Sequence, residues 1–202
     1  CSLKCPFCHN QALRDIKAPA GVFLYDIETF LKTHQKRLDG IVLSGGEPLV
    51  QADTAAFAAW IKSFGYQVGL HTSGVQPERL KAILPFLDWV GLDVKAPWRK
   101  YARLSGREGV VERVKQSLAL LADSGVSFEV RTTCDPRYLS VSDIYELAAD
   151  LKPYAVQTYV LQHYRTFDGD RNPPTSTQIE TFFQDTELSR FLKETFLQFL
   201  VR

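Results

Sequence analysis

The stretch Ile41-Val42-Leu43-Ser44-Gly45-Gly46-Glu47-Pro48 joins a short apolar run to a glycine-rich loop. The run is typical of a buried β-strand, and the loop is typical of a turn that leads into a helix. Further β-rich runs alternate with stretches of helical periodicity, and strands separated by helices favour right-handed βαβ units in a parallel sheet. The other expected strands are Gln67 to Thr72, Trp89 to Val94, Phe128 to Thr133 and Val156 to Leu161.

The stretches between these strands place apolar residues at helical spacing. With one more strand expected upstream of Cys1, six units are too few to close an eight-stranded barrel. They predict either a curved, partial barrel or an open doubly wound sheet. The expected helices run from Ile27 to Leu38 after the cap Asp26, from Phe57 to Phe64 before Gly65, from Pro77 through Leu84, from Val111 to Leu121 before Gly125, and from a cap at Ser142 or Asp143 to Leu151.

Polar side chains follow the end of each expected strand. The carboxyl ends of parallel strands meet at one edge of a sheet, where ligands bind in both architectures. Because several strands converge on one ligand, we expect an α/β fold with a curved sheet, a partial (β/α)6 TIM-like barrel. These polar groups are Ser44 to Glu47, His71 to Gly74, Asp93 with Lys95, Arg131, and His163.

Length and composition predict one core. The chain has 202 residues and 45% hydrophobic content, which is enough for one sizeable domain over residues 1–202. Within it, we expect residues 165–202 to form a C-terminal loop and helices. The chain begins on a cysteine and contains no methionine, so we expect an N-terminally truncated domain that lacks its first strand.

The charge balance and hydropathy bear on the class of partner. The chain carries 24 basic and 23 acidic residues, spread along its length, for a formal charge of +1. This balance predicts no broad cationic face for nucleic acid. No apolar run approaches the roughly 20 residues that span a bilayer, and no secretory signal is visible. We therefore expect a cytoplasmic protein that binds neither nucleic acid nor a membrane.

Three of the four cysteines lie within the opening CSLKCPFCHN, at Cys1, Cys5 and Cys8. An iron-sulfur cluster with four irons needs one ligand for each iron, so three thiolates leave one iron open to a substrate. A Cys3His zinc site with His9 is the alternative, although it leaves the glycine loop unexplained. Cys134 could close the cluster as a fourth ligand, but a small buried hydrophobe is the commoner role of a free cysteine.

The combined motifs resemble the radical S-adenosylmethionine superfamily. Cys1, Cys5 and Cys8 match its CxxxCxxC motif, with the aromatic Phe7 before the last cysteine. Gly45-Gly46-Glu47-Pro48 is similar to its GGE motif, and the resemblance extends through Asp93-Val94-Lys95 and His163 to about Tyr164. The two motifs in this order, with a strand between them, are a strong signal.

Within that superfamily the chain resembles the activating enzymes of glycyl radical enzymes, above all those of anaerobic ribonucleotide reductase and pyruvate formate-lyase. The resemblance implies a 4Fe-4S cluster and S-adenosylmethionine as cofactors, and an electron donor of the flavodoxin or ferredoxin type. It implies that the open iron chelates the amino and carboxylate groups of S-adenosylmethionine. Reductive cleavage then gives a 5'-deoxyadenosyl radical, which takes a hydrogen from a glycine of the partner. A radical enzyme acting on a small molecule would share the same motifs.

The resemblance also assigns S-adenosylmethionine contacts by position. Glycines let backbone groups approach a ligand closely. Glu47 either receives the ligand's ammonium or orients the loop, while Asp93 suits a ribose hydroxyl and Lys95 the ligand's carboxylate. His71 stands where the family often has an acid, which leaves the role of this position open. The expected contacts are Phe7, Gly45, Gly46, Glu47, Thr72, Ser73, Asp93, Lys95, Arg131 and His163.

A turn-rich stretch, Arg165 to Pro174, follows His163 directly. Its composition predicts a loop that borders the mouth of the sheet. Our hypothesis is that Arg165, Asp168 and Arg171 provide polar contacts that select the partner. A plain connection to the C-terminal helices is the alternative.

Overall fold

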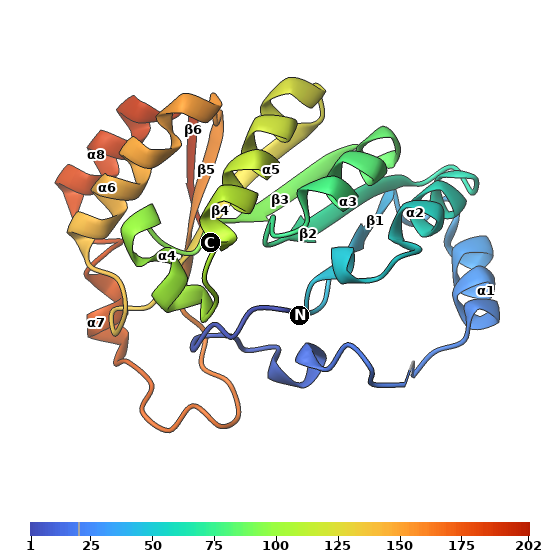
Figure 1. The fold of residues 1–202 in the computed structure, drawn as a ribbon, viewed down its shortest axis with the longest axis horizontal. Helices are drawn as coiled ribbons and strands as arrows, with labels where there is room; N and C mark the ends of the chain where they lie inside the picture. The colour runs from blue at the N-terminus through green and yellow to red at the C-terminus, as the bar shows by residue number, and fades with distance from the viewer. Residues whose placement is uncertain (20) are drawn as a thin grey trace.

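Six parallel strands form one open sheet in a computed structural model of the chain, which describes residues 1–19 and 21–202 (Figure 1). The strands follow each other across the sheet in chain order, and the two outermost strands are its edges. The predicted α/β partial barrel is therefore confirmed. The strands are β1 (Gly40–Leu43), β2 (Gln67–Thr72), β3 (Trp89–Asp93), β4 (Ser127–Cys134), β5 (Thr158–His163) and β6 (Gln198–Val201).

Helices cover the outer face of this sheet, and the cysteine loop crosses its open side (Figure 1). Helices lie between consecutive strands and provide the crossover connections that parallel strands need. The α-helices are α1 (Leu24–His34), α2 (Thr54–Lys62), α3 (Pro77–Ile83), α4 (Trp98–Ser105), α5 (Val110–Ser124), α6 (Val141–Leu151), α7 (Ser176–Glu180) and α8 (Thr186–Thr195). The 3-10 helices are η1 (Gln11–Arg14), η2 (Pro48–Val50), η3 (Leu84–Phe86) and η4 (Lys152–Tyr154).

β6 was not predicted. It lies inside residues 165–202, the stretch that was predicted to hold only a loop and helices. β6 pairs in parallel with β5, from Thr158 opposite Gln198 to Leu161 opposite Val201. Its four residues are too short a run for periodicity to separate from the preceding helix.

Four local predictions also need correction. α4 was not predicted, because half of its eight residues are polar. Its stop signal, Gly106, is a C-cap in the left-handed region at φ 65°. Ser140, rather than Ser142 or Asp143, caps α6. α1 has Phe23 as its N-cap, with the expected cap Asp26 in its first turn, and it ends at His34, before the expected Leu38. β1 is an edge strand and not a buried one, with Val42 50% exposed.

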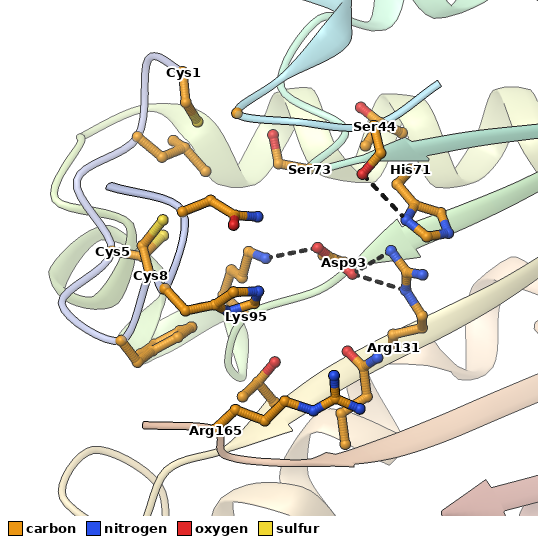
Figure 2. Close-up of a pocket in the computed structure, with 18 of the residues that line it drawn as sticks. Cys1, Cys5, Cys8, Ser44, His71, Ser73, Asp93, Lys95, Arg131 and Arg165 are labelled. Atoms are coloured by element: carbon orange, nitrogen blue, oxygen red, sulfur yellow. Dashed lines mark hydrogen bonds and ion pairs between the residues drawn. The ribbon is translucent and has the colours of Figure 1, made fainter. Parts of the chain in front are cut away.

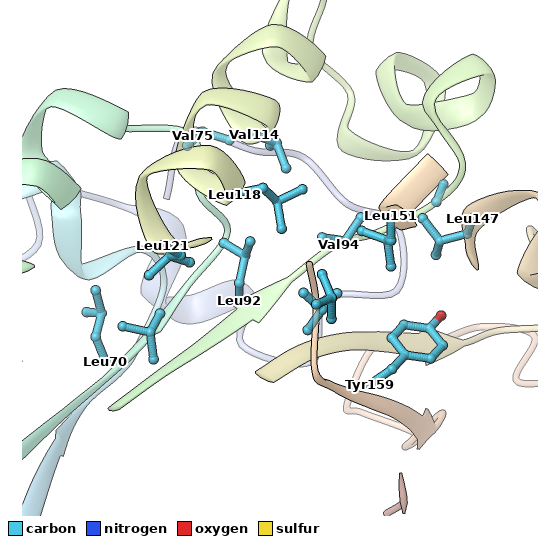
Figure 3. Packing of buried hydrophobic residues seen from close by; sticks show 14 of the residues in the cluster. Leu70, Val75, Leu92, Val94, Val114, Leu118, Leu121, Leu147, Leu151 and Tyr159 are labelled. Atoms are coloured by element: carbon cyan, nitrogen blue, oxygen red, sulfur yellow. The ribbon is translucent and has the colours of Figure 1, made fainter. Parts of the chain in front are cut away.

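The core lies between the sheet and its helices. Figure 3 shows Leu118 of α5 above Leu92 of β3, and both are fully buried. Alternate residues of a strand point to opposite faces, so the residues between these core positions face the inside of the curve. On β3 and β4 these inward residues are polar, at Asp93 and Arg131. The apolar outer face thus fixes which side chains enter the inner cavity.

None of the helices in the described residues, 1–19 and 21–202, combines the length and the apolar content that a membrane span requires.

Asp143 at the start of α6 holds α4 in place, and its replacement should destabilise the fold. Its carboxylate is fully buried and accepts hydrogen bonds from Lys100 (2.6 Å), Arg99 (2.8 Å) and the Ser140 amide (2.7 Å). Breaking a buried pair costs about 3 kcal/mol, so we expect Asp143→Asn to lower the free energy of unfolding at neutral pH by about that amount. Glu146→Gln, at the exposed end of the same network, is the matched control and should change it little.

The same group predicts a pH dependence. Burial acts to raise the pKa of Asp143, but the Lys100 and Ser140 hydrogen bonds outweigh burial and hold it below 3.8. A carboxyl group whose pKa is lower in the folded state stabilises the fold at pH values above its ordinary pKa. This contribution is lost as the pH falls from the ordinary pKa through the lower, folded-state pKa. We expect denaturant titrations of Asp143→Asn to show a shallower loss of stability between about pH 5 and pH 2 than the parent protein. Identical slopes would contradict this assignment.

Candidate active site

A cavity of about 350 Å3 opens at the carboxyl edge of the sheet, as predicted from the polar strand ends. It is lined by the cysteine loop, by the glycine loop after β1, and by the ends of β2 to β5 (Figure 2). All the predicted site residues except Glu47 line it. They are Cys1, Cys5, Phe7, Cys8, Gly45, Gly46, Thr72, Ser73, Asp93, Lys95, Arg131 and His163.

The cysteine loop turns alternate side chains toward the cavity. Leu3, Cys5 and Phe7 are buried, whereas Lys4 and Pro6 between them are exposed. The three loop cysteines are all free thiols. Figure 2 shows Cys5 and Cys8 with their sulfur atoms side by side, and Cys1 further along the loop. In residues 1–19 and 21–202, no three histidine, cysteine or acidic side chains stand in a ready-made metal site.

The donor set fits a cluster with an open iron better than a closed metal site. Three soft thiols from one loop enter one cavity, and thiolates are the usual ligands of iron-sulfur clusters. Burial raises the pKa of the Cys5 thiol, while the nearby Lys95 ammonium opposes this rise. Cys134 is fully buried at the end of β4, its Sγ lies 3.9 Å from the Thr132 carbonyl oxygen, and it does not line the cavity. It is not placed as a fourth ligand.

The turn η1 connects the cysteine loop to the glycine loop. The Arg14 guanidinium donates to the Cys5 carbonyl oxygen. A Cβ on Gly46 would lie 2.3 Å from the Leu13 carbonyl oxygen and 3.2 Å from the Cys1 Cβ, so only glycine allows this packing. Gly45 has φ 141° and its Cβ position meets no atom within 4 Å. Both glycines were predicted to let the backbone approach a ligand closely. At Gly46 the group that comes close is the chain's own Leu13 carbonyl. Arg14 was not predicted, because a single arginine carries no periodic signal.

Glu47 lies behind the glycine loop and is 3% exposed. Its carboxylate accepts hydrogen bonds from the Leu49 amide (3.2 Å), the Thr72 hydroxyl (2.8 Å) and the Ser73 amide (2.7 Å), and also from the Ser73 hydroxyl. These contacts join the loop after β1 to the end of β2. Of the two roles predicted for Glu47, the geometry favours orientation of the loop.

Glu47→Ala should consequently affect stability as well as ligand binding. The substitution leaves buried donors of Thr72 and Ser73 without an acceptor, and each such group costs about 1–3 kcal/mol. We expect the free energy of unfolding to fall by about 3 kcal/mol, measured by urea titration. Glu78→Ala, whose carboxylate is 70% exposed in its pair with Arg113, is the control and should change it by less than about 1 kcal/mol. A Glu47→Ala protein of unchanged stability would show that these hydrogen bonds are not needed.

Asp93, Lys95 and Arg131 form one ion-pair network on the cavity floor (Figure 2). The Lys95 Nζ lies 3.0 Å from Asp93 Oδ2, and the Arg131 Nε lies 2.9 Å from Asp93 Oδ1. The register of β3 and β4 places Asp93 directly opposite Arg131. A Cβ on Gly91 would lie 2.8 Å from the Arg131 Cζ, so this glycine gives the guanidinium its room.

The network keeps both signs of charge in the cavity. Burial acts to raise the pKa of Asp93, but Lys95 and Arg131 outweigh burial and hold it below its usual range. Burial likewise acts to lower the pKa of Lys95, and Asp93 outweighs it and raises the pKa. The site thus presents an ionised carboxylate beside an ammonium and a guanidinium. Such a set can bind a zwitterionic amino acid group together with hydroxyl groups.

Two of the three histidines that line the cavity, His71 and His163, belong to β2 and β5. His71 Nδ1 is 3.4 Å from the Ser44 Oγ, and its ring meets Trp89 edge-on at 5.5 Å. Burial lowers the pKa of His71, and the Arg131 charge lowers it further, so a neutral ring is favoured. His163 stacks on Phe183 with ring centroids 3.7 Å apart. Both rings line the cavity, and His163 is held by aromatic packing.

The stretch after His163 borders the cavity as predicted, but its three polar residues are separated. Arg165 lines the cavity, whereas Asp168 and Arg171 are exposed on the loop. Asp170, which was not predicted, anchors the loop through a salt bridge in which its Oδ1 lies 2.7 Å from the Arg137 Nη1. Other cavity residues were not predicted, because their types are common in ordinary strands and loops; they are Asn10, Thr133, Gln162, Tyr164 and Arg202.

The Radical SAM superfamily model matches residues 1–138, more than half of the chain, so the chain belongs to the Radical SAM superfamily. It is a radical SAM oxidoreductase, and members of this family use S-adenosylmethionine and a 4Fe-4S cluster. A Methanocaldococcus jannaschii protein named as a candidate glycyl-radical enzyme activating enzyme is 31% identical over 170 residues, which are 79% of this chain and 69% of that protein. The 7-carboxy-7-deazaguanine synthase of Thermococcus kodakarensis is 24% identical over 78% of this chain and 70% of its own.

Solved structures support the fold. SuiB of Streptococcus suis bound to S-adenosylmethionine superposes with a TM-score of 0.77 at 14% identity. The match covers 100% of this chain and 48% of SuiB, so the chain spans about half of that protein. The shared architecture is the partial barrel.

Proposed function

We propose that this chain installs a glycyl radical on a partner enzyme, most specifically an anaerobic ribonucleoside-triphosphate reductase. The observation that carries the proposal is one cavity that joins three free cysteines to a charged network at the strand ends of a radical SAM fold. The 31% identity to the Methanocaldococcus jannaschii relative supports the class of activating enzyme. The cysteine spacing, its continuation Cys8-His9-Asn10, the pair Asp93 and Lys95, and the late histidine support the same class.

The proposed cofactor site uses both ends of the cavity. Cys1, Cys5 and Cys8 hold the 4Fe-4S cluster, which when bound supplies the electron that cleaves S-adenosylmethionine to methionine and a 5'-deoxyadenosyl radical. Lys95 binds the ligand's carboxylate, and Asp93 accepts a hydrogen bond from a ribose hydroxyl. Arg131 holds Asp93 in place through its guanidinium. The cluster is supported over a zinc site by the superfamily match.

The remaining proposed contacts surround these groups. Phe7 packs the cysteine loop onto Tyr138, with ring centroids 6.1 Å apart. Gly45 leaves open space beside the ligand, while Thr72 and Ser73 anchor Glu47 and thereby the glycine loop. His163 borders the nucleoside.

The activity is tested by anaerobic reconstitution with iron, sulfide, S-adenosylmethionine and dithionite. We expect 5'-deoxyadenosine, and a glycyl radical signal in electron paramagnetic resonance when the reductase is added. Formation of 5'-deoxyadenosine without a radical on any glycyl radical enzyme would favour a small-molecule substrate, in line with the similarity to the deazaguanine synthase. A loaded cluster that gives no 5'-deoxyadenosine would contradict the cofactor chemistry itself.

The loop 165–174 supplies a second test of the partner. Asp168 and Arg171 are exposed, and we propose that they contact the partner outside the cavity. The double variant Asp168→Ala/Arg171→Ala should lower the rate of glycyl radical formation about tenfold, which corresponds to about 1.4 kcal/mol. Uncoupled 5'-deoxyadenosine formation should be unchanged. Equal loss of both activities would place these residues at the nucleoside pocket, and no loss would leave the loop a plain connection.

A further inference from the structure

The outer face of the cysteine loop carries a cation. Lys4 stands between Cys1 and Cys5, and its side chain is exposed while its neighbours Leu3 and Cys5 are buried. It does not line the cavity. The backbone of the cysteine loop therefore separates the Lys4 side chain from the cavity that Cys1, Cys5 and Cys8 line.

The loop rests on the C-terminal end of α4 at this point. The Lys4 amide donates to the Ser105 carbonyl oxygen at 2.8 Å. A Cβ on Gly106 would lie 2.8 Å from the Lys4 Cβ, so the two backbones are in close contact. Arg103 and Arg107, on either side of this contact in the sequence, are both exposed. The fold thus brings three cationic residues to the outside of the cysteine loop.

The cations of α4 divide into two groups. In the first turn, Arg99 pairs with Glu146 and Asp143, and Lys100 pairs with Asp143. Within residues 1–19 and 21–202, the side chains of Lys4, Arg103 and Arg107 make no ion pair or hydrogen bond. This positive excess is local, since the whole chain has a formal charge of +1.

The dipole of α4 does not by itself account for these three cations. A cation in the last turn complements the helix dipole, and this explains Arg103. It does not explain Arg107, which follows the cap, or Lys4, which belongs to another segment. Glu108 is exposed next to Arg107 and reduces the excess by one charge.

We propose that Lys4, Arg103 and Arg107 form the docking surface for an acidic one-electron donor protein. The inference rests on the proposed function, because it requires a cluster at Cys1, Cys5 and Cys8. The reduced donor loses one electron, which the cluster receives, and no covalent bond forms or breaks at the surface. Complementary charge accelerates such encounters by about 10- to 1,000-fold and makes them sensitive to salt.

The test compares two charge-reversal variants of the full chain. Lys4→Glu/Arg103→Glu/Arg107→Glu alters the surface, and Lys81→Glu/Arg190→Glu/Lys193→Glu makes the same change at exposed positions of α3 and α8. With reduced flavodoxin, and separately with reduced ferredoxin, we expect the first variant to form 5'-deoxyadenosine about tenfold more slowly than the parent, and the control to keep its rate. With dithionite, which needs no docking, the parent and both variants should match.

Direct binding gives a readout that does not depend on turnover. Oxidised flavodoxin and ferredoxin, titrated calorimetrically at low and high salt, should bind the first variant about tenfold more weakly and with a smaller salt effect. Arg103→Glu/Arg107→Glu, which leaves the cysteine loop untouched, should show part of the loss with unchanged iron content.

Unchanged donor binding and donor-driven rates in both surface variants would overturn the inference. Equal losses with dithionite and with the protein donors would also overturn it, because the substitutions would then act on the cluster or the ligand. If the parent protein shows no cleavage even with dithionite, the proposed function fails. Donor binding then still decides whether the surface docks an acidic redox protein.

Discussion

Alanine at Cys1, Cys5 or Cys8 is expected to abolish the cluster and every activity that depends on it. Each substitution leaves two thiolates, and two ligands do not retain a cluster of four irons. Iron content after anaerobic reconstitution should fall to the background of the apoprotein, and the reduced protein should give no cluster signal in electron paramagnetic resonance. The formation of 5'-deoxyadenosine should fall below detection.

Cys134→Ala is the matched control because it removes the one remaining cysteine. Burial raises the pKa of the Cys134 thiol far above its usual range, and the residue lies outside the cavity. Iron content should equal that of the parent, with a loss of stability of about 1 kcal/mol from the small void. Loss of the cluster in this variant would mean that Cys134 is a ligand and that the site is closed.

The sequence predicted the edge of the sheet at which the site lies because the strand pattern constrains it strongly. Polar residues follow the apolar runs of β2, β3 and β4, residues two apart on a strand share a face, and parallel strands place their carboxyl ends together. Asp93 and Arg131 were therefore expected on one surface before any contact was known. The register of β3 and β4 then made them direct neighbours.

Contacts between segments without periodicity could not be predicted. The close packing of Gly46 against the Leu13 carbonyl oxygen depends on how two loops pack, and each loop alone permits many conformations. The burial of Glu47 follows from its bonds to Thr72 and Ser73, which belong to another strand end. The salt bridge of Arg202 with the buried Glu129 depends on β6, whose short run gave no signal. Local patterns specify elements, whereas these contacts come from their assembly.

The charged network at the strand ends is held together independently of the cluster. Asp93, Lys95 and Arg131 are paired with each other and do not need the cluster to hold their positions. The proposed ligand pocket is thus preorganised at the strand ends, while the cysteine loop supplies the proposed metal ligands. Preorganised charges keep their geometry when a ligand binds, which lowers the cost of binding. Substitutions in the network should therefore separate ligand affinity from iron content.

Asp93→Asn is expected to weaken the binding of S-adenosylmethionine about 10- to 100-fold without loss of iron. The amide keeps the size of the side chain but removes the charge that holds Lys95 and Arg131 together, and each charge-assisted hydrogen bond contributes about 1.5–3 kcal/mol. Asp88→Asn is the matched control, since Asp88 lies just before the other end of β3 and pairs with Lys62 on the surface. Equilibrium binding to the reconstituted protein, with iron measured on the same sample, gives both quantities. Equal affinities in the two variants would mean that the pocket lies elsewhere, and loss of iron in Asp93→Asn would mean that the network supports the cluster instead of the ligand.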